Sequence, residues 1–396
     1  DDKIIARSHE EGMPPLELSA SFIEETRRDL ASIKVRPATF EPKVTEHIDD
    51  IVSIVQTMMD KKVAYLVDGD VYYAVDTFAQ YCKLSGRKLE DLVAGSRIEI
   101  NENKRNPFDF ALWKSSKPDE PSWDSPWGRG RPGWHIECSA MSSRYLGEAF
   151  DIHCGGQDLI FPHHENELAQ SRCAHDGRDF ARYWVHNGFL SIDHEKMSKS
   201  LGNVVLVHDL VKTIPGEVIR LALLSAHYRQ PLDWSEETIK SSKRMLDRLY
   251  GAVRGIDLSD EARAAAEPPA ALVAALEDDI NTPKAMAEFF ALAKDLNKAA
   301  DAGEKARLAA AMYAAGDLMG LLQSDPEEWF AGDVEGDDTG GHIDKGGRRA
   351  ERKVIKKQIV INPHINYLGT RIGRVVDDLQ AGGRHRRLPA TPRPDR

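Results

Sequence analysis

The chain contains 396 residues, of which 41% are hydrophobic and 30% are charged, and its formal net charge at pH 7 is −11. This length allows two to four domains, and the lack of an apolar run of about eighteen residues predicts a protein without a membrane-spanning helix. The negative charge argues against a general coat for nucleic acids, and four cysteines without a visible secretory leader indicate a reducing, cytoplasmic environment rather than a disulfide framework.

The first part of the chain predicts two helices and a hairpin. Residues 21–35 have the composition of a helix, with Ser19 or Ser21 near its N-cap. Residues 63–75 predict a β-hairpin that turns at the Asp-Gly pair 68–69. Between these segments, apolar residues recur at the spacing of an amphipathic helix: Ile48, Ile51, Ile54 and Val55.

Residue types that bind metals gather in the middle of the chain. Cys138 follows a Gly-Trp-His run, and His163 precedes Glu167 by four residues, directly after Pro162. Because proline favours the start of a helix, we expect His163 and Glu167 on one helical face, where their side chains converge. Cysteine, histidine and glutamate all ligate zinc. Taken singly, a buried cysteine and a surface helix are the simpler interpretation, but together with the lysines described below they favour a zinc site.

The string GEAFDIHCGG predicts a strand that ends in Gly155 and Gly156, followed by Asp158. A glycine pair at the end of a strand permits close approach of the backbone to a nucleotide. From these residues alone a plain turn is the simpler interpretation. The same holds for Trp134 as a core residue and for His153 as a hydrogen-bonded histidine.

Two lysines follow in the string EKMSKSLGN. Lys196 and Lys199 stand three residues apart among small and polar residues, before Gly202. A loop of this kind can bring ammonium groups to the phosphates of ATP, where charge builds when a carboxylate attacks the α-phosphate. A short lysine pair by itself is more often a solvated loop, so its context decides the interpretation.

From about residue 206 the chain predicts helices. Asp233 and Glu236 predict a capping box, and Thr282 before Pro283 predicts an N-cap and a first helical position. Three or four amphipathic helices of this kind form a bundle. We interpret their apolar stripes as core, with Val218, Leu221, Leu224, Ile239, Leu246, Leu249, Val253, Met286, Phe289, Phe290, Ala293 and Leu296, and a further run from Leu308 to Leu322.

The end of the chain is basic. Residues 341–396 carry 14 Lys and Arg residues against 5 Asp and Glu residues. We expect the tail 333–396 to be disordered. Binding of RNA phosphates by this tail and an altered reading frame or engineered end are both open interpretations.

The chain resembles the cysteinyl-tRNA synthetases, a family of class I aminoacyl-tRNA synthetases. The resemblance runs from the first residue to about Gly332. It is carried, in family order, by GWHIECSAM, DIHCGGQDLIFPHHENELAQS, KMSKSLGN, RLALLSAHYRQPLDWSEE, DDINTPKAMAEFF and GLLQSDPEEWF. It implies an α/β fold in which an incomplete class I nucleotide-binding (Rossmann-like) domain is followed by an α-helical bundle.

The resemblance also implies roles for the residues singled out above. A zinc ion held by Cys138, His163 and Glu167 would bind the thiolate of the substrate cysteine, and serine offers no equal bond, so no editing site is needed. Trp134 and His153 would shape the pocket for the amino acid. ATP, with magnesium, would be bound through Gly155, Gly156, Asp158 and Lys199, and Lys196 and Lys199 would stabilise charge on the phosphates.

Two features depart from the family pattern. The family has a fourth zinc ligand, a cysteine in its first strand, followed by a HIGH-type histidine motif. This chain has neither, and Cys82, Cys154 and Cys173 do not occupy that place. We therefore expect a chain that is incomplete at its N-terminus and inactive in isolation. The resemblance also stops after about Gly332, so we expect the tail to lack the family's last domain.

By resemblance the function is that of a cysteine–tRNA ligase, a cytoplasmic, monomeric enzyme that uses cysteine, ATP and tRNA(Cys). Two alternatives stay open: a cysteine ligase of thiol biosynthesis that acts on an amino-sugar, and a non-catalytic fragment that binds zinc and RNA. The DDINTPKA helix region favours tRNA. The expected divisions are the remainder of the first catalytic half at 1–44, an insertion at 45–130, the second catalytic half with the zinc site at 131–190, the lysine loop and stem-contact region at 191–235, a tRNA-binding bundle at 236–332, and the tail at 333–396.

Overall fold

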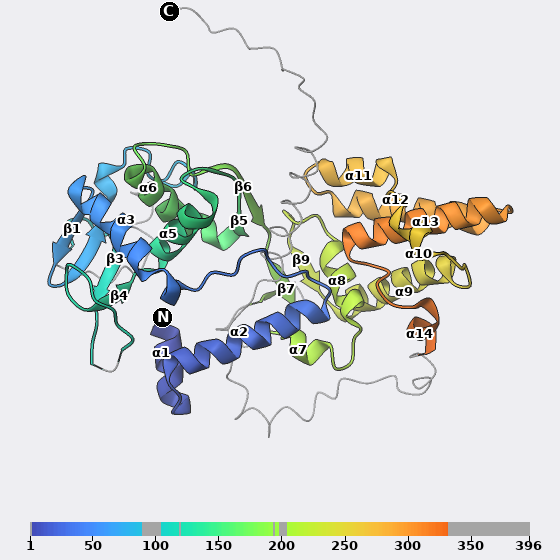
Figure 1. Ribbon diagram of the computed structural model, residues 1–396, viewed down its shortest axis with the longest axis horizontal. Coiled ribbons are helices and arrows are strands. Elements are labelled where there is room, and N and C mark those ends of the chain that lie inside the picture. Colours follow the sequence, from blue (N-terminus) through green and yellow to red (C-terminus); the bar gives the residue numbers. More distant parts are fainter. Residues whose placement is uncertain (1, 89–103, 119, 193–194, 198–203, 332–396) are drawn as a thin grey trace, which may run out of the picture.

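Figure 1 shows three groups of elements in the computed structural model: a mixed group of strands and helices, a bundle of helices, and a narrow region of short strands and helices between them. The structure describes residues 2–88, 104–118, 120–192, 195–197 and 204–331. The predicted tail and Lys199 lie outside these residues. Of the helices that are described, none combines the length and the apolar composition needed to cross a membrane.

The chain begins with two helices, α1 (Asp2–Glu11) and α2 (Pro15–Ser32). α2 starts before the predicted cap, because a proline occupies its first turn, where a missing N–H costs nothing. Ser19 and Ser21 lie inside the helix, and their hydroxyls donate to backbone carbonyls four and three residues earlier, at 2.9 and 2.8 Å. The predicted serine cap is therefore wrong, and α1 was not predicted.

The next unit is an antiparallel sheet with strand order β1–β2–β3–β4. The predicted hairpin is confirmed, since Asp68 and Gly69 have φ angles of 52° and 86°, as the tight turn of a two-residue hairpin requires. The predicted stripe on α3 is buried against this sheet. The elements are η1 (Val44–Glu46), α3 (Ile48–Asp60), β1 (Ala64–Val67), β2 (Asp70–Tyr73), η2 (Val75–Thr77), β3 (Phe110–Ser115) and β4 (Gly130–Pro132).

A parallel pair of strands carries the middle of the chain. β5 and β6 run side by side, and α6 forms the crossover that a parallel pair requires. α3, α5 and α6 pack on one another, and residues of α5 and α6 join α3 and the antiparallel sheet in one hydrophobic core. The elements are α5 (Trp134–Leu146), β5 (Phe150–Gly156), η3 (Gln157–Leu159), η4 (Ile160–His164), α6 (Glu165–Ala174) and β6 (Ala181–Asn187).

In the region between the two larger groups, the side chain of Arg220 binds backbone oxygens from two segments far apart in the sequence. This buried arginine of α8 donates to the backbone oxygens of Met319 at 2.8 Å, Lys34 at 2.9 Å and Ile33 at 3.1 Å. It therefore joins the end of α2 to the end of the bundle. The elements of the region are β7 (Leu190–Ile192), β8 (Glu195–Lys196), α7 (Val207–Leu210), α8 (Gly216–Leu224) and β9 (Leu232–Trp234).

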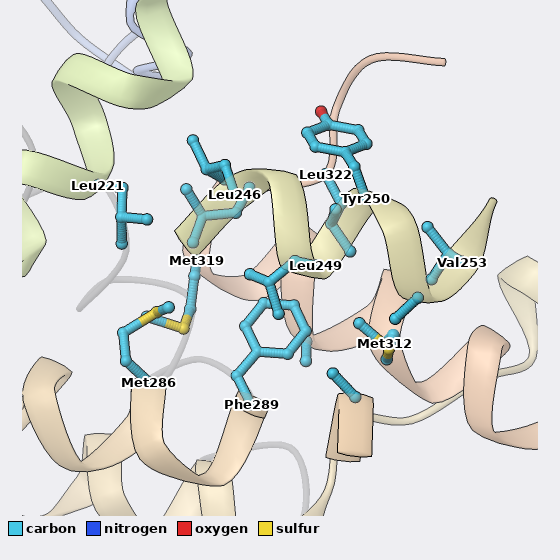
Figure 2. Packing of buried hydrophobic residues seen from close by; sticks show 14 of the residues in the cluster. Leu221, Leu246, Leu249, Tyr250, Val253, Met286, Phe289, Met312, Met319 and Leu322 are labelled. Carbon is cyan, nitrogen blue, oxygen red and sulfur yellow. The ribbon is translucent and has the colours of Figure 1, made fainter. Parts of the chain in front are cut away.

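The helical bundle predicted from the second half is confirmed. Figure 2 shows side chains of α8, α9, α12 and α13 meeting in one core, among them Leu249, Phe289 and Met312. Every residue singled out for the predicted stripes, together with Leu308 and Leu322 at the ends of the last run, lies in this core or packs against it. The helices are α9 (Glu236–Val253), α10 (Asp260–Ala264), α11 (Ala270–Glu277), α12 (Thr282–Lys298), α13 (Ala302–Met319) and α14 (Pro326–Ala331).

Two helix caps differ from the prediction. Ser235 rather than Asp233 caps α9, and Asn281 rather than Thr282 caps α12. In both, the side-chain oxygen accepts from the amide three residues ahead, at 3.3 and 3.1 Å. Asp233 instead accepts a hydrogen bond from the hydroxyl of Ser191 in β7, at 2.8 Å. Asp233 therefore makes a tertiary hydrogen bond instead of the helix-capping bond that the local pattern predicted.

Candidate functional site

Three side chains with metal-binding atoms meet where α5 packs against α6. The Sγ atom of Cys138, an imidazole nitrogen of His163 and a carboxylate oxygen of Glu167 all lie within 4.8 Å of one another. His163 and Glu167 are buried, and Cys138 is half-buried. The residues that the sequence proposed as zinc ligands are thus brought together from two separate helical segments.

Two local features place this cluster. Gly133 precedes α5, and a Cβ atom there would overlap the backbone of Ala111 in β3, so the helix begins against the sheet only because the residue is glycine. α6 begins at Glu165, two residues later than the sequence predicted. His163, in the turn before it, still faces Glu167, with its Nε2 atom 3.6 Å from Oε1.

The two oxygens of Glu167 have different surroundings. Oε2 lies 3.0 Å from Nε2 of His153, a hydrogen-bond distance. Oε1 is buried and has no hydrogen-bond partner. A buried carboxylate oxygen without a donor is costly unless a cation neutralises it. The orphaned oxygen points to the side where Cys138 and His163 lie, so the donor set fits a zinc ion with sulfur, nitrogen and oxygen ligands.

Neighbouring rings orient the imidazole of His163. Its Nδ1 atom lies 2.8 Å from Nδ1 of His135, which leaves Nε2 directed toward Glu167. A hydrogen bond at Nδ1 fixes the tautomer of a histidine that binds a metal through Nε2. Trp134 stacks on the same ring with centroids 4.3 Å apart, and 56% of Trp134 remains exposed. Trp134 therefore lies at the open side of the cluster.

Burial sets the charge state of this cluster without a cation. It lowers the pKa of His135 to about 3 and also lowers that of His163, so both rings are neutral. Burial, followed by the charge of Glu167, raises the pKa of Cys138 well above its usual range. A bound divalent cation reverses this balance, because its charge favours the thiolate.

A second group of rings lies behind Glu167, and sequence reasoning missed it. His164 pairs with His186 of β6 through Nδ1 and Nε2 atoms 2.8 Å apart, and Trp184 lies against both rings. Burial and neighbouring histidines lower the pKa of His164 to about 2, and burial lowers that of His186 to about 4. His153, His164 and Glu167 form a second set of possible ligands, which shares its carboxylate with the first.

The sequence held a signal for part of this group. Trp184 and His186 alternate along β6, so they share one face of the strand. Their meeting with His164 depends on the crossover between β5 and β6. His135 carried the weaker signal of lying three residues before Cys138 on one helix.

The residues proposed for the nucleotide occupy the end of β5. Gly155 and Gly156 are buried there, and Asp158 is exposed in the turn that follows. A Cβ atom on Gly155 would come within 2.5 Å of the His164 ring. The missing side chain thus leaves room for that imidazole. The backbone of Lys196 lies in β8, paired with Ser191 of β7.

Two known families match this chain. The family described as the tRNA synthetases class I (C) catalytic domain matches residues 1–244, and the DALR domain matches residues 271–323. The first match takes in the whole of the described site, and the second takes in α12 and α13 of the bundle.

Two proteins similar in sequence are both cysteine–tRNA ligases. The cysteine–tRNA ligase of Parvibaculum lavamentivorans is 52% identical over 358 residues, which are 90% of this chain and 75% of that protein. That of Xanthomonas campestris pv. campestris is 52% identical over 357 residues, 90% of this chain and 77% of its own length. Among solved structures, Mycobacterium tuberculosis methionyl-tRNA synthetase in complex with methionyl-adenylate superimposes with a TM-score of 0.52 at 16% identity, covering 83% of each chain. This last likeness shows a shared fold.

Proposed function

Because this chain belongs to the cysteine–tRNA ligases, a family of class I aminoacyl-tRNA synthetases, we propose that its site serves the activation of cysteine with ATP and the transfer of cysteine to tRNA(Cys), and that turnover also needs the HIGH-type histidine motif that this chain lacks. Class membership makes it an ATP-using ligase. Our more specific proposal is that Cys138, His163 and Glu167 hold a zinc ion at the cysteine pocket, that magnesium accompanies ATP, and that the enzyme works as a monomer.

One observation carries the zinc proposal. The Oε1 atom of Glu167 is buried without a hydrogen-bond partner, and its neighbours are a thiol and the free nitrogen of a neutral imidazole. A buried carboxylate oxygen without a donor is costly unless a cation neutralises it, and the thiol, the imidazole and the carboxylate are all zinc ligands. His153 supports this arrangement from behind, because it holds the other oxygen of Glu167.

The residues of the site have different roles in the recognition of cysteine. Zinc, when bound, supplies a bond to a thiolate that the harder hydroxyl of serine does not match. Trp134 stacks on His163 with more than half of its side chain exposed, so it is placed to cover the substrate. His153 touches Glu167 and acts on the pocket through that carboxylate, as a positioning residue.

We assign the ATP side of the site to the end of β5 and to the lysine segment. Gly156 ends β5 at the carboxyl edge of the parallel pair, the edge at which open α/β sheets bind ligands. Gly155 and Asp158 flank it. Lys196 and Lys199 would meet the negative charge that develops on the phosphates during adenylation.

The match of the DALR domain to residues 271–323 supports tRNA as the acceptor. We therefore assign the bundle at 236–332 to tRNA binding.

A ligase for an amino-sugar acceptor would share the metal site, and a direct comparison of the two acceptors separates this alternative from a tRNA ligase. We expect the full chain to shift tRNA(Cys) in a native gel and not to bind an amino-sugar. Binding of the sugar without tRNA would favour the other ligase.

Cobalt substitution tests the cysteine pocket independently of turnover. Cobalt(II) bound to thiolates absorbs in the near ultraviolet, so each added thiolate ligand increases this band. We expect added cysteine to increase the band of the cobalt-loaded full chain and added serine to leave it unchanged. Cys138→Ser should weaken the starting band. A spectrum that does not respond to cysteine would contradict the pocket assignment.

A further inference from the structure

The connection between α11 and α12 is strained. Asp279 and Ile280 both have left-handed backbone angles, with φ of 55° and 53°, although neither is glycine. For a β-branched residue such as Ile280 this conformation is a true outlier. Strain of this kind costs about 1–3 kcal/mol per residue and persists only where surrounding contacts hold it. The contacts that hold this turn are therefore informative.

Asp279 supplies those contacts by binding the loop between α8 and β9. Its carboxylate accepts two hydrogen bonds from Arg229, at 2.7 and 2.9 Å, and one from the hydroxyl of Tyr228, at 2.6 Å. Two parallel bonds between a guanidinium and a carboxylate fix direction as well as distance. Thr282, at the start of α12, adds a bond to the carbonyl of Ala226 at 3.3 Å.

The bound loop lies directly beside the edge of the proposed site. The amide of Gly188, the residue after β6 ends at Asn187, donates to the carbonyl of Tyr228 at 2.7 Å. A Cβ atom on Gly188 would come within 2.6 Å of the carbonyl oxygen of Gln230, so the two segments touch through their backbones. A chain of short contacts thus runs from the turn of Asp279 to the carboxyl end of β6, two residues from His186.

The chain of contacts joins two units. Tyr228 and Arg229 lie within the match to the catalytic domain, and Asp279 lies within the match to the DALR domain. We propose that Asp279 is a positioning residue for transfer to tRNA, which clamps the bundle to the rim of the catalytic site through Arg229 and Tyr228. This inference rests on the proposed function, since it takes tRNA as the molecule that spans both units.

The physical benefit of a clamp is effective concentration. A tRNA that binds the bundle reaches the catalytic site as an intramolecular partner only if the two surfaces keep a fixed relation. A loose joint leaves each surface intact and lowers the gain from binding both. Strain at Asp279 and Ile280 is consistent with a turn selected for the direction in which it presents the carboxylate.

Hydrogen exchange of the full chain tests the clamp without tRNA or turnover. Asp279→Asn should speed exchange of the Gly188 amide by about tenfold, the effect of losing about one charge-assisted hydrogen bond. The matched control is Asp278→Asn, which changes the neighbouring carboxylate, 3.8 Å from Lys284. Amides of the β1–β2 hairpin should be unchanged in both variants. If Asp279→Asn fails to fold, Tyr228→Phe removes one bond of the clamp and serves in its place. Wild-type exchange at Gly188 in Asp279→Asn, or in Tyr228→Phe where it serves in its place, would overturn the proposal.

Binding of RNA then separates the clamp from the proposed function. Asp279→Asn should weaken binding of a whole tRNA(Cys) transcript by about tenfold and leave unchanged the binding of its anticodon stem-loop, the part that we expect the bundle alone to contact. Equal losses for both RNAs would mean that Asp279 acts only on the bundle surface, and would overturn the clamp. A wild-type chain that binds neither RNA would contradict the proposed function, while the exchange experiment would still decide whether the clamp exists.

Discussion

The buried carboxylate of Glu217 in α8 accepts a hydrogen bond from the backbone amide of Leu322, 105 residues away, at 3.0 Å. It also accepts from the amide of Gln323 and from the hydroxyl of Tyr250. The carboxylate therefore stands in for the backbone partners that this segment lacks after α13 ends. Two of the sequence strings that carry the resemblance to the family, one beginning at Arg220 and one containing Leu322, lie next to each other here.

Removing this carboxylate should destabilise the fold. Glu217→Ala leaves two amides and a hydroxyl without an acceptor, and each buried donor left unpaired costs about 1–3 kcal/mol. We expect the free energy of unfolding in urea to fall by about 3 kcal/mol. Glu10→Ala, at an exposed position of α1, should change it by less than about 0.5 kcal/mol. Equal effects would contradict the role of Glu217.

Zinc content should depend on one cysteine. Cys138→Ser replaces the thiol of the proposed site, so we expect most of the zinc to be lost after dialysis, as measured by mass spectrometry of the metal. Cys173→Ser is the control, because its sulfur lies 3.2 Å from the Tyr73 hydroxyl and a serine hydroxyl can keep that contact. Zinc retained by the Cys138 variant would remove it from the ligand set.

His153 should tune the metal through Glu167. His153→Ala removes the partner of Oε2, and losing such an outer partner weakens metal binding by about 10- to 100-fold. His153→Gln keeps a donor and should recover part of this loss. Competition with a coloured chelator measures both affinities. Unchanged affinity in the alanine variant would show that Glu167 needs no support from this side.

Gly155 and Gly251 should respond oppositely to alanine. Gly155→Ala brings a methyl group against the His164 ring and should destabilise the fold by about 1–3 kcal/mol. Gly251 lies in α9 with open space around it, so Gly251→Ala should stabilise by about 0.5–1 kcal/mol. Thermal unfolding measures both. Stabilisation by both variants would mean that His164 moves aside without cost.

The clamp at Asp279 should weaken in acid. Its hydrogen bonds with Arg229, and then with Tyr228, hold the pKa of Asp279 below its usual range. A lowered folded pKa adds stability above the unfolded pKa of about 3.9, and this stability is lost as the pH falls through the folded value. The difference in thermal midpoint between wild type and Asp279→Asn should shrink as the pH falls below about pH 4. A difference that keeps its size from about pH 4 to about pH 3 would contradict this.

Local patterns predicted the parts of this fold that local physics determines. The stripe of α3 and the turn at Asp68 and Gly69 were predictable because burial and turn geometry act over a few residues. The cap of α9 lies two residues beyond the predicted Asp233, which accepts a hydrogen bond from Ser191 of β7. The cap of α12 lies one residue before the predicted Thr282, whose hydroxyl donates to the carbonyl of Ala226.

The site was predictable only in part. Cys138, His163 and Glu167 were recognisable by residue type and by a four-residue spacing. The pairs His135–His163 and His164–His186 join segments 28 and 22 residues apart, and no local period reports such a meeting. The hydrogen bond between Arg229 and Asp279 joins residues 50 positions apart, so the sequence did not predict it for the same reason.

Gly155 and His164 share one small volume: the space that a side chain on β5 would need is already filled by the imidazole. Sequence change at the two positions is therefore coupled. A relative that carries a side chain at the position of Gly155 must carry a smaller residue at that of His164, or must move the ring away from His186. A substitution at Gly155 alone disrupts the packing against the His164 ring, and a substitution at His164 alone removes its contact with His186. We therefore expect the two positions to vary together among relatives.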